Sequence, residues 1–211
     1  MSALTIDFVS DVICPWCFIG FTRLEQALAQ AGEDNAEVTL RPFQLDPSIP
    51  PEGADLRARL ESKYGVAADT MFGRVEAAAR ESGIPLDFAK VRRMPNTLKP
   101  HALIGAALAK GTQRALARAI FAAYFLEGQD LSDDAVLVAL ATAHGFSAAE
   151  ATAILADPRA LEETRAEAAE LAGQGLGGVP FTIFEGKLAV SGAQPVEAFR
   201  QAMKQAREAA P

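Results

Sequence analysis

Cysteine is scarce in this chain, whose 211 residues include only Cys14 and Cys17. Structural zinc sites use four protein ligands, which two thiols alone do not supply. A single pair is also far from the dense disulfide framework that holds small secreted domains together. We therefore expect neither a metal centre built from one chain's cysteines nor a fold that depends on disulfides.

Positive charge is also in short supply. Lys and Arg number 20 against 27 Asp and Glu, which leaves a formal net charge of −7 at pH 7. Nucleic acids and anionic membranes bind basic surfaces, so we expect neither as a partner.

The sequence has no apolar run of membrane-spanning length. The apolar stretch from Phe8 to Phe21 is shorter than the roughly 20 residues of a transmembrane helix, and Asp11 and Pro15 interrupt it. The first residues lack the basic and long apolar segments of a secretory signal. We therefore expect a cytoplasmic protein, in a compartment where a disulfide is more often catalytic than structural.

The start of the chain is typical of a β-α-β unit. Apolar and polar residues alternate from Leu4 to Phe8, which predicts a strand with one buried side. A 3.6-residue apolar spacing then predicts a helix over 15–31, ended by Gly32. Apolar residues in 38–43 indicate a second strand, which a crossover connection would place parallel to the first.

A Pro-rich stretch at 46–55 ends that unit, and the segment after it reads as helical. Apolar spacing and capping residues predict helices near 56–64, 71–83, 98–111, 112–128, 132–145 and from 147 onward. Ser132 is expected to cap the fifth of these helices, and "SAAE" at 147–150 predicts a capping box.

The end of the chain returns to mixed structure. Asp157-Pro158 predicts a helix to Gly173, and two short strands flank a hairpin turn before a last helix from Pro195. This order predicts an α/β protein with a thioredoxin-like fold and an inserted all-helical domain. We expect the thioredoxin-like domain in 1–48 and 157–211, and the helical insertion in 49–156.

The two cysteines stand three positions apart in "CPWC". Two cysteines placed at random would show this spacing roughly once in a hundred sequences. The pair follows a predicted strand and opens a helix, which is the setting of a redox CxxC motif. Cys14 is expected at the N-cap with Pro15 at the first helical position, where its missing N–H costs nothing.

This placement assigns different roles to the thiols. Unpaired amides at a helix N-terminus stabilise a thiolate at Cys14, and the thiolate is the nucleophile of disulfide exchange. Cys17 lies one turn deeper, so we predict that it resolves the mixed disulfide. Trp16 is either a core residue or, as we favour, a partly exposed apolar face for a polypeptide or glutathione.

A second element accompanies the thiols. "GGVPFTIF" at 177–184 places Pro180 at the start of a strand. A trans proline entering an edge strand is one interpretation, and a cis bond beside the CxxC is the one we favour. A cis Pro180 would expose the backbone of Val179, which could pair with an extended substrate beside Cys14.

Five motifs in order resemble the DsbA-family oxidoreductases and, within them, the FrnE-like branch. They are "SDVICPWCFIG", "RPFQLDP", "NTLKPHAL", "GVPFTIF" and "SGAQP", and the similarity covers essentially the whole chain. The resemblance implies a thioredoxin domain split by helices, with Cys14 as nucleophile, Cys17 as resolving thiol and Pro180 as cis-proline. It also implies thiol–disulfide oxidoreductase or isomerase activity on protein or peptide disulfides or on small thiols, with no bound cofactor.

Other functions stay open on the sequence alone. Kappa-class glutathione transferases and 2-hydroxychromene-2-carboxylate isomerases, which belong to the same superfamily, use glutathione and typically carry serine at the nucleophile position. Glutathione could also be a substrate or reductant here. A peptide holdase and a zinc site shared by two chains are the remaining alternatives, and the oligomeric state, monomer or homodimer, stays open.

Several further residues have two interpretations. Asn96 is either a helix cap or a polar residue of the substrate groove. His101 is either a satisfied structural histidine or a groove residue, as the "NT…H" resemblance suggests. Arg92 and Arg93 are either solvated or able to meet an acidic ligand. The apolar residues of 71–75 and 121–125 are expected in the core, with a minority lining an apolar groove beside Trp16.

Overall fold

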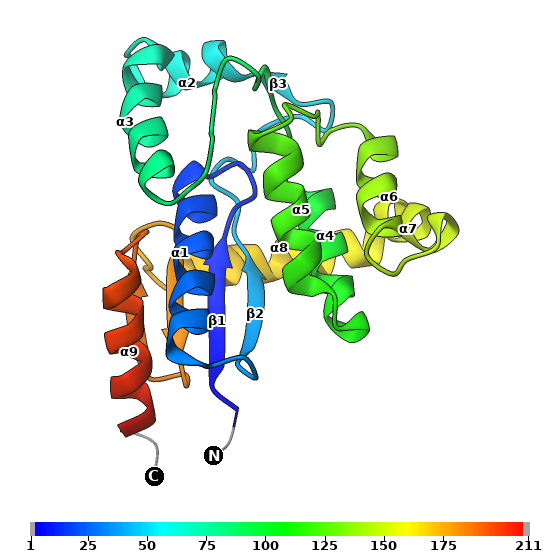
Figure 1. Cartoon of the computed structure of the whole chain (residues 1–211). Helices are drawn as coiled ribbons and strands as arrows, with labels where there is room; N and C mark the ends of the chain where they lie inside the picture. Colours follow the sequence, from blue (N-terminus) through cyan, green and yellow to red (C-terminus); the bar gives the residue numbers. More distant parts are fainter. Residues whose placement is uncertain (1–2, 209–211) are drawn as a thin grey trace.

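The computed structural model describes residues 3–208. Its main sheet has four strands in the order β2-β1-β5-β6. Figure 1 shows β1 and β2 side by side. These strands are β1 (Thr5–Ser10), β2 (Glu37–Pro42), β5 (Phe181–Phe184) and β6 (Leu188–Ser191). β1 and β2 run parallel, whereas β5 is antiparallel to both β1 and β6. The predicted β-α-β unit and terminal hairpin are therefore confirmed.

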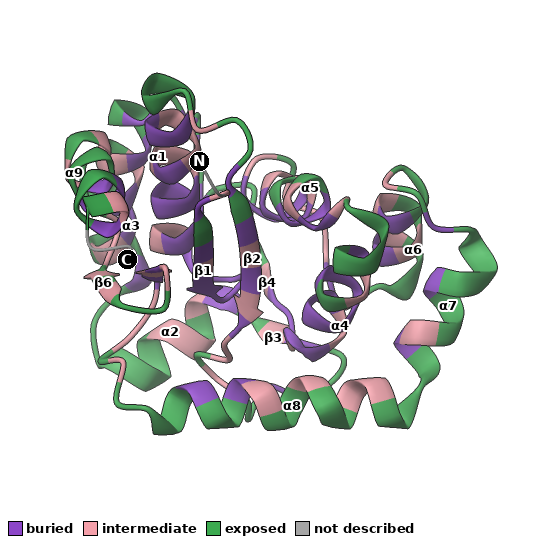
Figure 2. Cartoon of the chain, turned by 90° about the horizontal axis from the view of Figure 1, so that it is seen from below, coloured by how far each residue is buried: buried purple, intermediate pink, exposed green. Residues whose placement is uncertain are grey.

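Helices cover both faces of this sheet. α1 (Pro15–Ala31) makes the crossover from β1 to β2 and packs beside α9 (Val196–Glu208) on one face. α8 (Pro158–Gly173) crosses the other face and packs on β2 (Figure 2). α8 starts as predicted, because the Asp157 side chain accepts from the Arg159 amide at 2.9 Å and Pro158 takes the first position.

The hairpin between β5 and β6 follows from its turn residues. Glu185 and Gly186 both have positive φ, at 52° and 63°, and the Lys187 amide donates to the Phe184 carbonyl at 3.0 Å. Positive φ values at both central positions of this turn match the right-handed twist of the strands. Gly186 adopts this conformation without steric cost.

The insertion between β2 and α8 is mostly helical. Its helices are α2 (Leu56–Tyr64), α3 (Ala68–Glu81), α4 (Leu98–Ala107), α5 (Gln113–Phe125), α6 (Asp134–Thr142) and α7 (Ala148–Ala156), with a 3₁₀ turn at Leu108–Lys110. The predicted capping box of α7 is present in full. A two-stranded sheet of β3 (Ala54–Asp55) and β4 (Arg93–Met94) was not predicted, because two-residue strands carry no alternation.

The expected cap at Ser132 is wrong. α6 begins one residue later, where the Asp133 side chain accepts from the Ala135 amide at 2.8 Å. The Ser132 hydroxyl is buried instead against Gly53, so close that a Cβ built on Gly53 would lie 2.6 Å from it. The Asp133 carboxylate performs the capping that was expected of the Ser132 hydroxyl.

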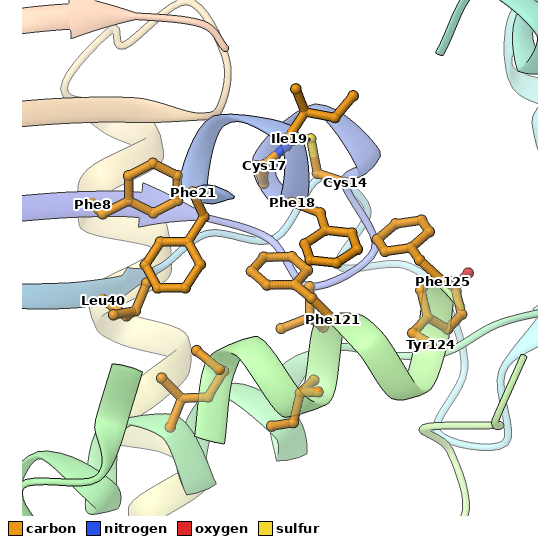
Figure 3. Close-up of a cluster of buried hydrophobic side chains, with 14 of the residues drawn as sticks. Phe8, Cys14, Cys17, Phe18, Ile19, Phe21, Leu40, Phe121, Tyr124 and Phe125 are labelled. Carbon is orange, nitrogen blue, oxygen red and sulfur yellow. Dashed lines mark hydrogen bonds between the residues drawn. The ribbon is translucent and has the colours of Figure 1, made fainter. Parts of the chain in front are cut away.

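The core joins the sheet to the insertion through aromatic rings. Phe8 of β1 meets Phe21 of α1 at a centroid distance of 5.3 Å. One turn earlier in α1, Phe18 stacks on Phe121 and Phe125 of α5 at centroid distances of 5.4 and 5.9 Å (Figure 3). The insertion is thus anchored directly on the helix that carries the CxxC motif.

Within residues 3–208, no helix combines the length and the apolar character needed to cross a membrane.

Candidate active site

Cys14 occupies the N-cap of α1, as the sequence predicts. Its backbone is extended, with φ −88° and ψ 110°, and Pro15 takes the first helical position. The Cys14 Sγ accepts from the Cys17 amide at 3.3 Å, and its carbonyl accepts from the amides of Cys17 and Phe18. An amide aimed at the sulfur from a helix N-terminus stabilises negative charge there, which suits a nucleophilic thiolate.

Cys17 lies one turn further along α1 in a different environment. Both cysteines are free thiols, but Cys17 has no exposed surface whereas Cys14 is 4% exposed. Burial, followed by the interaction with Cys14, raises the pKa of the Cys17 thiol well above its ordinary value. Cys17 is thus a protonated thiol with no exposed surface, next to a Cys14 that keeps a small one.

The Val179–Pro180 peptide bond is cis, as favoured from the sequence, and it adjoins the thiols. The Val179 carbonyl lies 3.8 Å from the Cys14 Sγ and accepts from its thiol. Pro180 packs on α1 at Gly20, where an added Cβ would lie 2.9 Å from the Pro180 Cγ. Only glycine at position 20 leaves room for this ring at its observed place.

Beneath the CxxC turn, Asp11 holds the loop that carries it. Its carbonyl accepts from the Cys14 amide at 3.0 Å, and its carboxylate accepts from the Leu45 amide at 2.7 Å. Asp11 has no exposed surface, and its Oδ1 lies 3.4 Å from Nε2 of His101, a buried residue of α4. Nε2 of His101 also lies 3.0 Å from the Phe43 carbonyl. This contact ties the insertion to the active-site loop.

A cavity of about 290 Å³ opens beside Cys14, between the start of α1 and the insertion. Pro15, Trp16 and Val179 line it from the thioredoxin-like side. The insertion side is largely apolar and consists of Leu56, Leu60, Met71, Phe72, Val75, Phe88, Met94, Tyr124 and Phe125. Trp16 is half-buried, which agrees with the predicted partly exposed ring. Of the apolar residues in 71–75 and 121–125, more line the cavity than the expected minority: Met71, Phe72, Val75, Tyr124 and Phe125.

Charged residues stand at the mouth of the cavity. Arg59 of α2 binds the Asp46 carboxylate through Nε and Nη2 at 2.8 and 2.9 Å, and Ser48 donates to the same carboxylate. Burial pushes the pKa of Asp46 upward, but the hydrogen bonds from Ser48 and Arg59 outweigh it and hold the pKa below its ordinary value. The Lys63 ammonium donates to the Leu45 carbonyl at 3.1 Å.

The structure brings together five of the predicted site residues and leaves two outside the cavity. The five that line or border it are Cys14, Pro15, Trp16, Val179 and Pro180, with Cys17 directly behind them. Asn96 instead donates to the Ile49 carbonyl at 2.6 Å and accepts from the Leu98 amide at 3.0 Å. His101 is buried against Asp11, away from the cavity lining.

Arg92 and Arg93, which could have been either solvated or part of a site for an acidic ligand, lie outside the cavity as well. Arg92 is exposed, and Arg93 donates to the Glu52 carbonyl and pairs with Asp130 at 3.7 Å. Neither lines the cavity. Asp11 and Gly20 were not predicted as parts of the site. Asp11, a charged residue between an apolar strand and the CxxC, was the available signal.

The family assignment follows from this geometry and from comparison with known proteins. Residues 5–204 match the DSBA-like thioredoxin domain family, so the chain belongs to that family of thiol oxidoreductases. A structure described as a "probable DsbA oxidoreductase" from Streptomyces coelicolor is 35% identical, with a TM-score of 0.89 over 99% of this chain and 92% of that one.

Two more distant structures share the fold. The cytosolic disulfide reductase DsbM from Pseudomonas aeruginosa, solved with GSH, is 21% identical, with a TM-score of 0.69 over 97% of this chain and 100% of that one. A 2-hydroxychromene-2-carboxylate isomerase is 18% identical, with a TM-score of 0.67 over 95% of each chain. The predicted family and the thioredoxin-like fold with its helical insertion are therefore confirmed.

Proposed function

We propose that this protein is a thiol–disulfide oxidoreductase or isomerase that exchanges disulfides with protein or small-thiol substrates through Cys14 and Cys17. One observation carries the proposal. A sulfur at a helix N-cap, beside a cis-proline and in the lining of the cavity, lies one turn from a thiol that has no exposed surface and a raised pKa. This asymmetry separates an attacking thiol from a resolving thiol.

The reaction proceeds through a mixed disulfide. The Cys14 thiolate attacks one sulfur of a substrate disulfide, and the other substrate sulfur leaves as a thiolate that takes up a proton. Cys17 then loses its proton and attacks the Cys14 sulfur, which releases the second substrate thiol. The substrate gains two electrons, and the protein ends with a Cys14–Cys17 disulfide. The same steps in reverse oxidise a substrate dithiol.

The geometry supports a place for the substrate chain. The Val179 carbonyl adjoins the Cys14 sulfur, and within residues 3–208 the Val179 amide has no acceptor. An extended substrate could therefore pair with this backbone while its disulfide faces Cys14. No bound cofactor is needed for these steps, and glutathione is the proposed small-thiol reductant. We place the reaction in the cytoplasm and the chain in the FrnE-like branch on its motifs.

The test is a redox equilibration in glutathione buffers, followed through Trp16 fluorescence. Trp16 is the only tryptophan and stands between the two cysteines. A reversible two-electron transition is expected, which disappears in Cys14→Ser. A potential near about −120 to −180 mV marks an oxidant or isomerase, and one near about −270 mV marks a reductase.

A glutathione-dependent isomerase or transferase is the second candidate, supported by the likeness to the 2-hydroxychromene-2-carboxylate isomerase. That chemistry would not need a resolving thiol. Glutathione-dependent turnover of an aromatic substrate that survives in Cys17→Ser, without a reversible Cys14–Cys17 couple, would favour it over disulfide exchange.

A further inference from the structure

We propose that a surface hollow along α5, separate from the cavity beside Cys14, binds a small phosphate monoester through Arg114 and Arg118. The two hollows share no lining residue. The inference therefore does not depend on the proposed exchange function, and it gives this protein a second ligand. It rests on the size of the hollow, the shortage of negative charge around the two arginines, and the apolar floor between them.

The hollow along α5 has a volume of about 560 Å³, which lies within the range of small-ligand sites, roughly 300–1,000 Å³. Glu25 of α1 and His144, which follows α6, line it from the neighbouring segments. The remaining lining residues, from α5 and the turn before it, are Gly111, Arg114, Ala115, Arg118, Ala119 and Ala122. Arg114 and Arg118 stand four positions apart on α5, so both project from the same side of the helix.

One carboxylate serves both guanidinium groups. Arg118 donates to Oε2 of Glu25, and Nη2 of Arg114 lies 3.6 Å from Oε1 of the same side chain, beyond hydrogen-bond distance. Among residues 3–208, Arg114 has no hydrogen-bond acceptor and Arg118 has Glu25 alone. A guanidinium carries five N–H donors, so most donors at this hollow have no acceptor in the protein.

The contrast with Arg159 shows that this charge is undercompensated. Arg159 has a carboxylate of its own, Glu163 at 2.9 Å, and that hydrogen bond raises the pKa of Arg159. Burial instead lowers the pKa of both Arg114 and Arg118. Their charged forms are therefore less stable here than in water, because the one shared carboxylate does not replace the lost hydration. A bound anion would supply the missing negative charge.

The donor set fits a phosphate group better than a carboxylate. A phosphate monoester carries a charge of about −1.5 to −2 at pH 7 and three terminal oxygens, which two forked guanidiniums can bind in pairs. His144 adds a third polar group. Its Nδ1 donates to the Leu140 carbonyl at 2.7 Å, which leaves Nε2 to accept from a protonated phosphate oxygen or, in the imidazolium, to donate to an ionised one.

The floor of the hollow selects a small ester. Ala115, Ala119 and Ala122 present methyl groups beside the arginines, and a compact apolar or planar group attached to the phosphate would gain by covering them. Protein docking surfaces expose large apolar residues, but the ones that the described chain exposes, Leu45, Tyr64, Val66 and Leu108, lie outside this lining. The occupant is therefore a small molecule rather than a phosphorylated protein.

The experiment titrates phenyl phosphate into the reduced protein by calorimetry, at an ionic strength held constant with sodium chloride. We expect saturable one-to-one binding with a Kd at or below about 1 mM, and a Tm that rises with ligand concentration. Phenol, which lacks the phosphate, should not bind. The absence of saturable phenyl phosphate binding up to about 10 mM would overturn the proposal.

Two further probes test the ligand class. Inorganic phosphate should bind at least about threefold more weakly than phenyl phosphate, because it covers none of the alanine floor. Equal affinity of the two probes would overturn the assignment of an ester. A phosphoserine peptide that bound more tightly than phenyl phosphate would overturn the assignment of a small molecule.

Variants locate the site. Arg114→Gln and Arg118→Gln should each weaken phenyl phosphate binding at least about tenfold, whereas Arg159→Gln, the matched control on α8, should bind as the wild type does. Arg114→Lys keeps the charge but loses the forked donors, so it should stay at least about threefold weaker than the wild type. Unchanged binding in both Gln variants would place the phosphate elsewhere and overturn the site. Wild-type affinity in Arg114→Lys would show attraction by net charge alone and overturn it as well.

Discussion

The two walls of the cavity are held in place by different interactions. On the thioredoxin-like wall the backbone sets the geometry: Cys14 caps α1, and the cis Val179–Pro180 peptide leads into β5. On the insertion wall, side chains from separate segments set it. Phe72 and Phe88 stack at a centroid distance of 4.1 Å, and Phe125 meets Phe88 edge-on at 6.2 Å.

This difference suggests that the thioredoxin-like wall governs the exchange reaction and the insertion wall governs which substrates react. The Cys14 sulfur at the helix N-terminus and the Val179 backbone keep the same positions whichever substrate binds. Single substitutions can change the shape and polarity of the insertion wall without moving these reacting groups. Substitutions on the first wall should therefore alter the chemical step, and those on the second should alter which substrates react.

The largest effect on exchange activity is expected for Cys17→Ser, on the thioredoxin-like wall. Cys14 would still attack, but nothing within the chain would resolve the mixed disulfide, because Cys14 and Cys17 are the only cysteines. Turnover of a peptide disulfide should fall by at least roughly a thousandfold, while a covalent adduct of protein and peptide accumulates. Intact-mass spectrometry before and after reduction measures the adduct. Turnover close to wild type would show that an external thiol resolves the intermediate.

The second prediction compares the two thiols directly. Cys17 has no exposed surface and a raised pKa, so iodoacetamide at neutral pH should modify Cys14 alone in the reduced protein. We expect at least about a hundredfold difference in rate, measured by peptide mapping of the alkylated chain. Equal labelling of both residues would remove the distinction between attacking and resolving thiols.

The raised pKa of Cys17 also gives a stability prediction. Because the folded pKa lies above the unfolded one, the contribution is fully present below about pH 8.5. It is lost as pH rises through the folded pKa, since the unfolded thiol ionises first. The reduced protein should thus unfold at lower denaturant concentrations as pH rises above about 8.5, and Cys17→Ala should lack this component.

His101 links the two walls, so its removal tests how they depend on each other. Its ring lies 3.4 Å from the buried Asp11 carboxylate under the CxxC turn. His101→Ala should leave that carboxylate short of a partner and cost about 3 kcal/mol of stability, measured by urea unfolding. A cost near zero would fit a histidine on an exposed groove rather than one buried against the active-site loop.

The thioredoxin-like wall was largely predictable from the sequence, because the residues that form it at Cys14 are neighbours in the sequence. The spacing in "CPWC", the proline after Cys14 and the strand before it act within a few residues. The cis bond at Pro180 was favoured only together with the CxxC, from which it is distant in sequence. Asp11 was not recognised as a site residue because its partners, Leu45 and His101, come from other parts of the chain.

The insertion wall was predictable only as a set of helices. Apolar periodicity located α3 and α5, but it does not say which of their apolar residues fill the core and which border a cavity. Phe121 and Phe125 both stack on Phe18, yet only Phe125 reaches the cavity lining. That distinction depends on the crossing of three helices, which a one-dimensional pattern does not contain.

Gly20→Ala tests the close contact between α1 and Pro180 behind the thioredoxin-like wall. In an open helix this change gains about 0.5–1 kcal/mol, but here the new methyl would lie 2.9 Å from the Pro180 Cγ. Overpacking costs about 1–3 kcal/mol, so we expect a net loss of roughly 1–2 kcal/mol and slower exchange with every peptide. Gly105→Ala in α4 is the matched control, since nothing lies within 4 Å of its Cβ position, and it should be stabilising. Equal behaviour of the two variants would mean that Pro180 yields easily.

The smallest effect is expected away from both walls, at the capping box of α7. Ser147→Ala removes the hydroxyl that accepts from the Glu150 amide at 3.1 Å and should cost about 1 kcal/mol, a shift of roughly 2–4 °C in Tm. Exchange rates and peptide preferences should not change, because this helix end contributes nothing to the cavity.

The same capping box predicts an acid-sensitive component of stability. The hydrogen bond from the Ser147 amide, followed by those from the Ser147 hydroxyl and Lys110, lowers the pKa of Glu150 to about 2. Because this folded pKa lies below the unfolded one, the contribution is present above about pH 4.3 and lost as pH falls through about 2. Glu150→Gln should therefore flatten the acid limb of the Tm profile without altering exchange at neutral pH. If it slowed exchange as well, the insertion would transmit changes from α7 to the dithiol, and the two walls would not be independent.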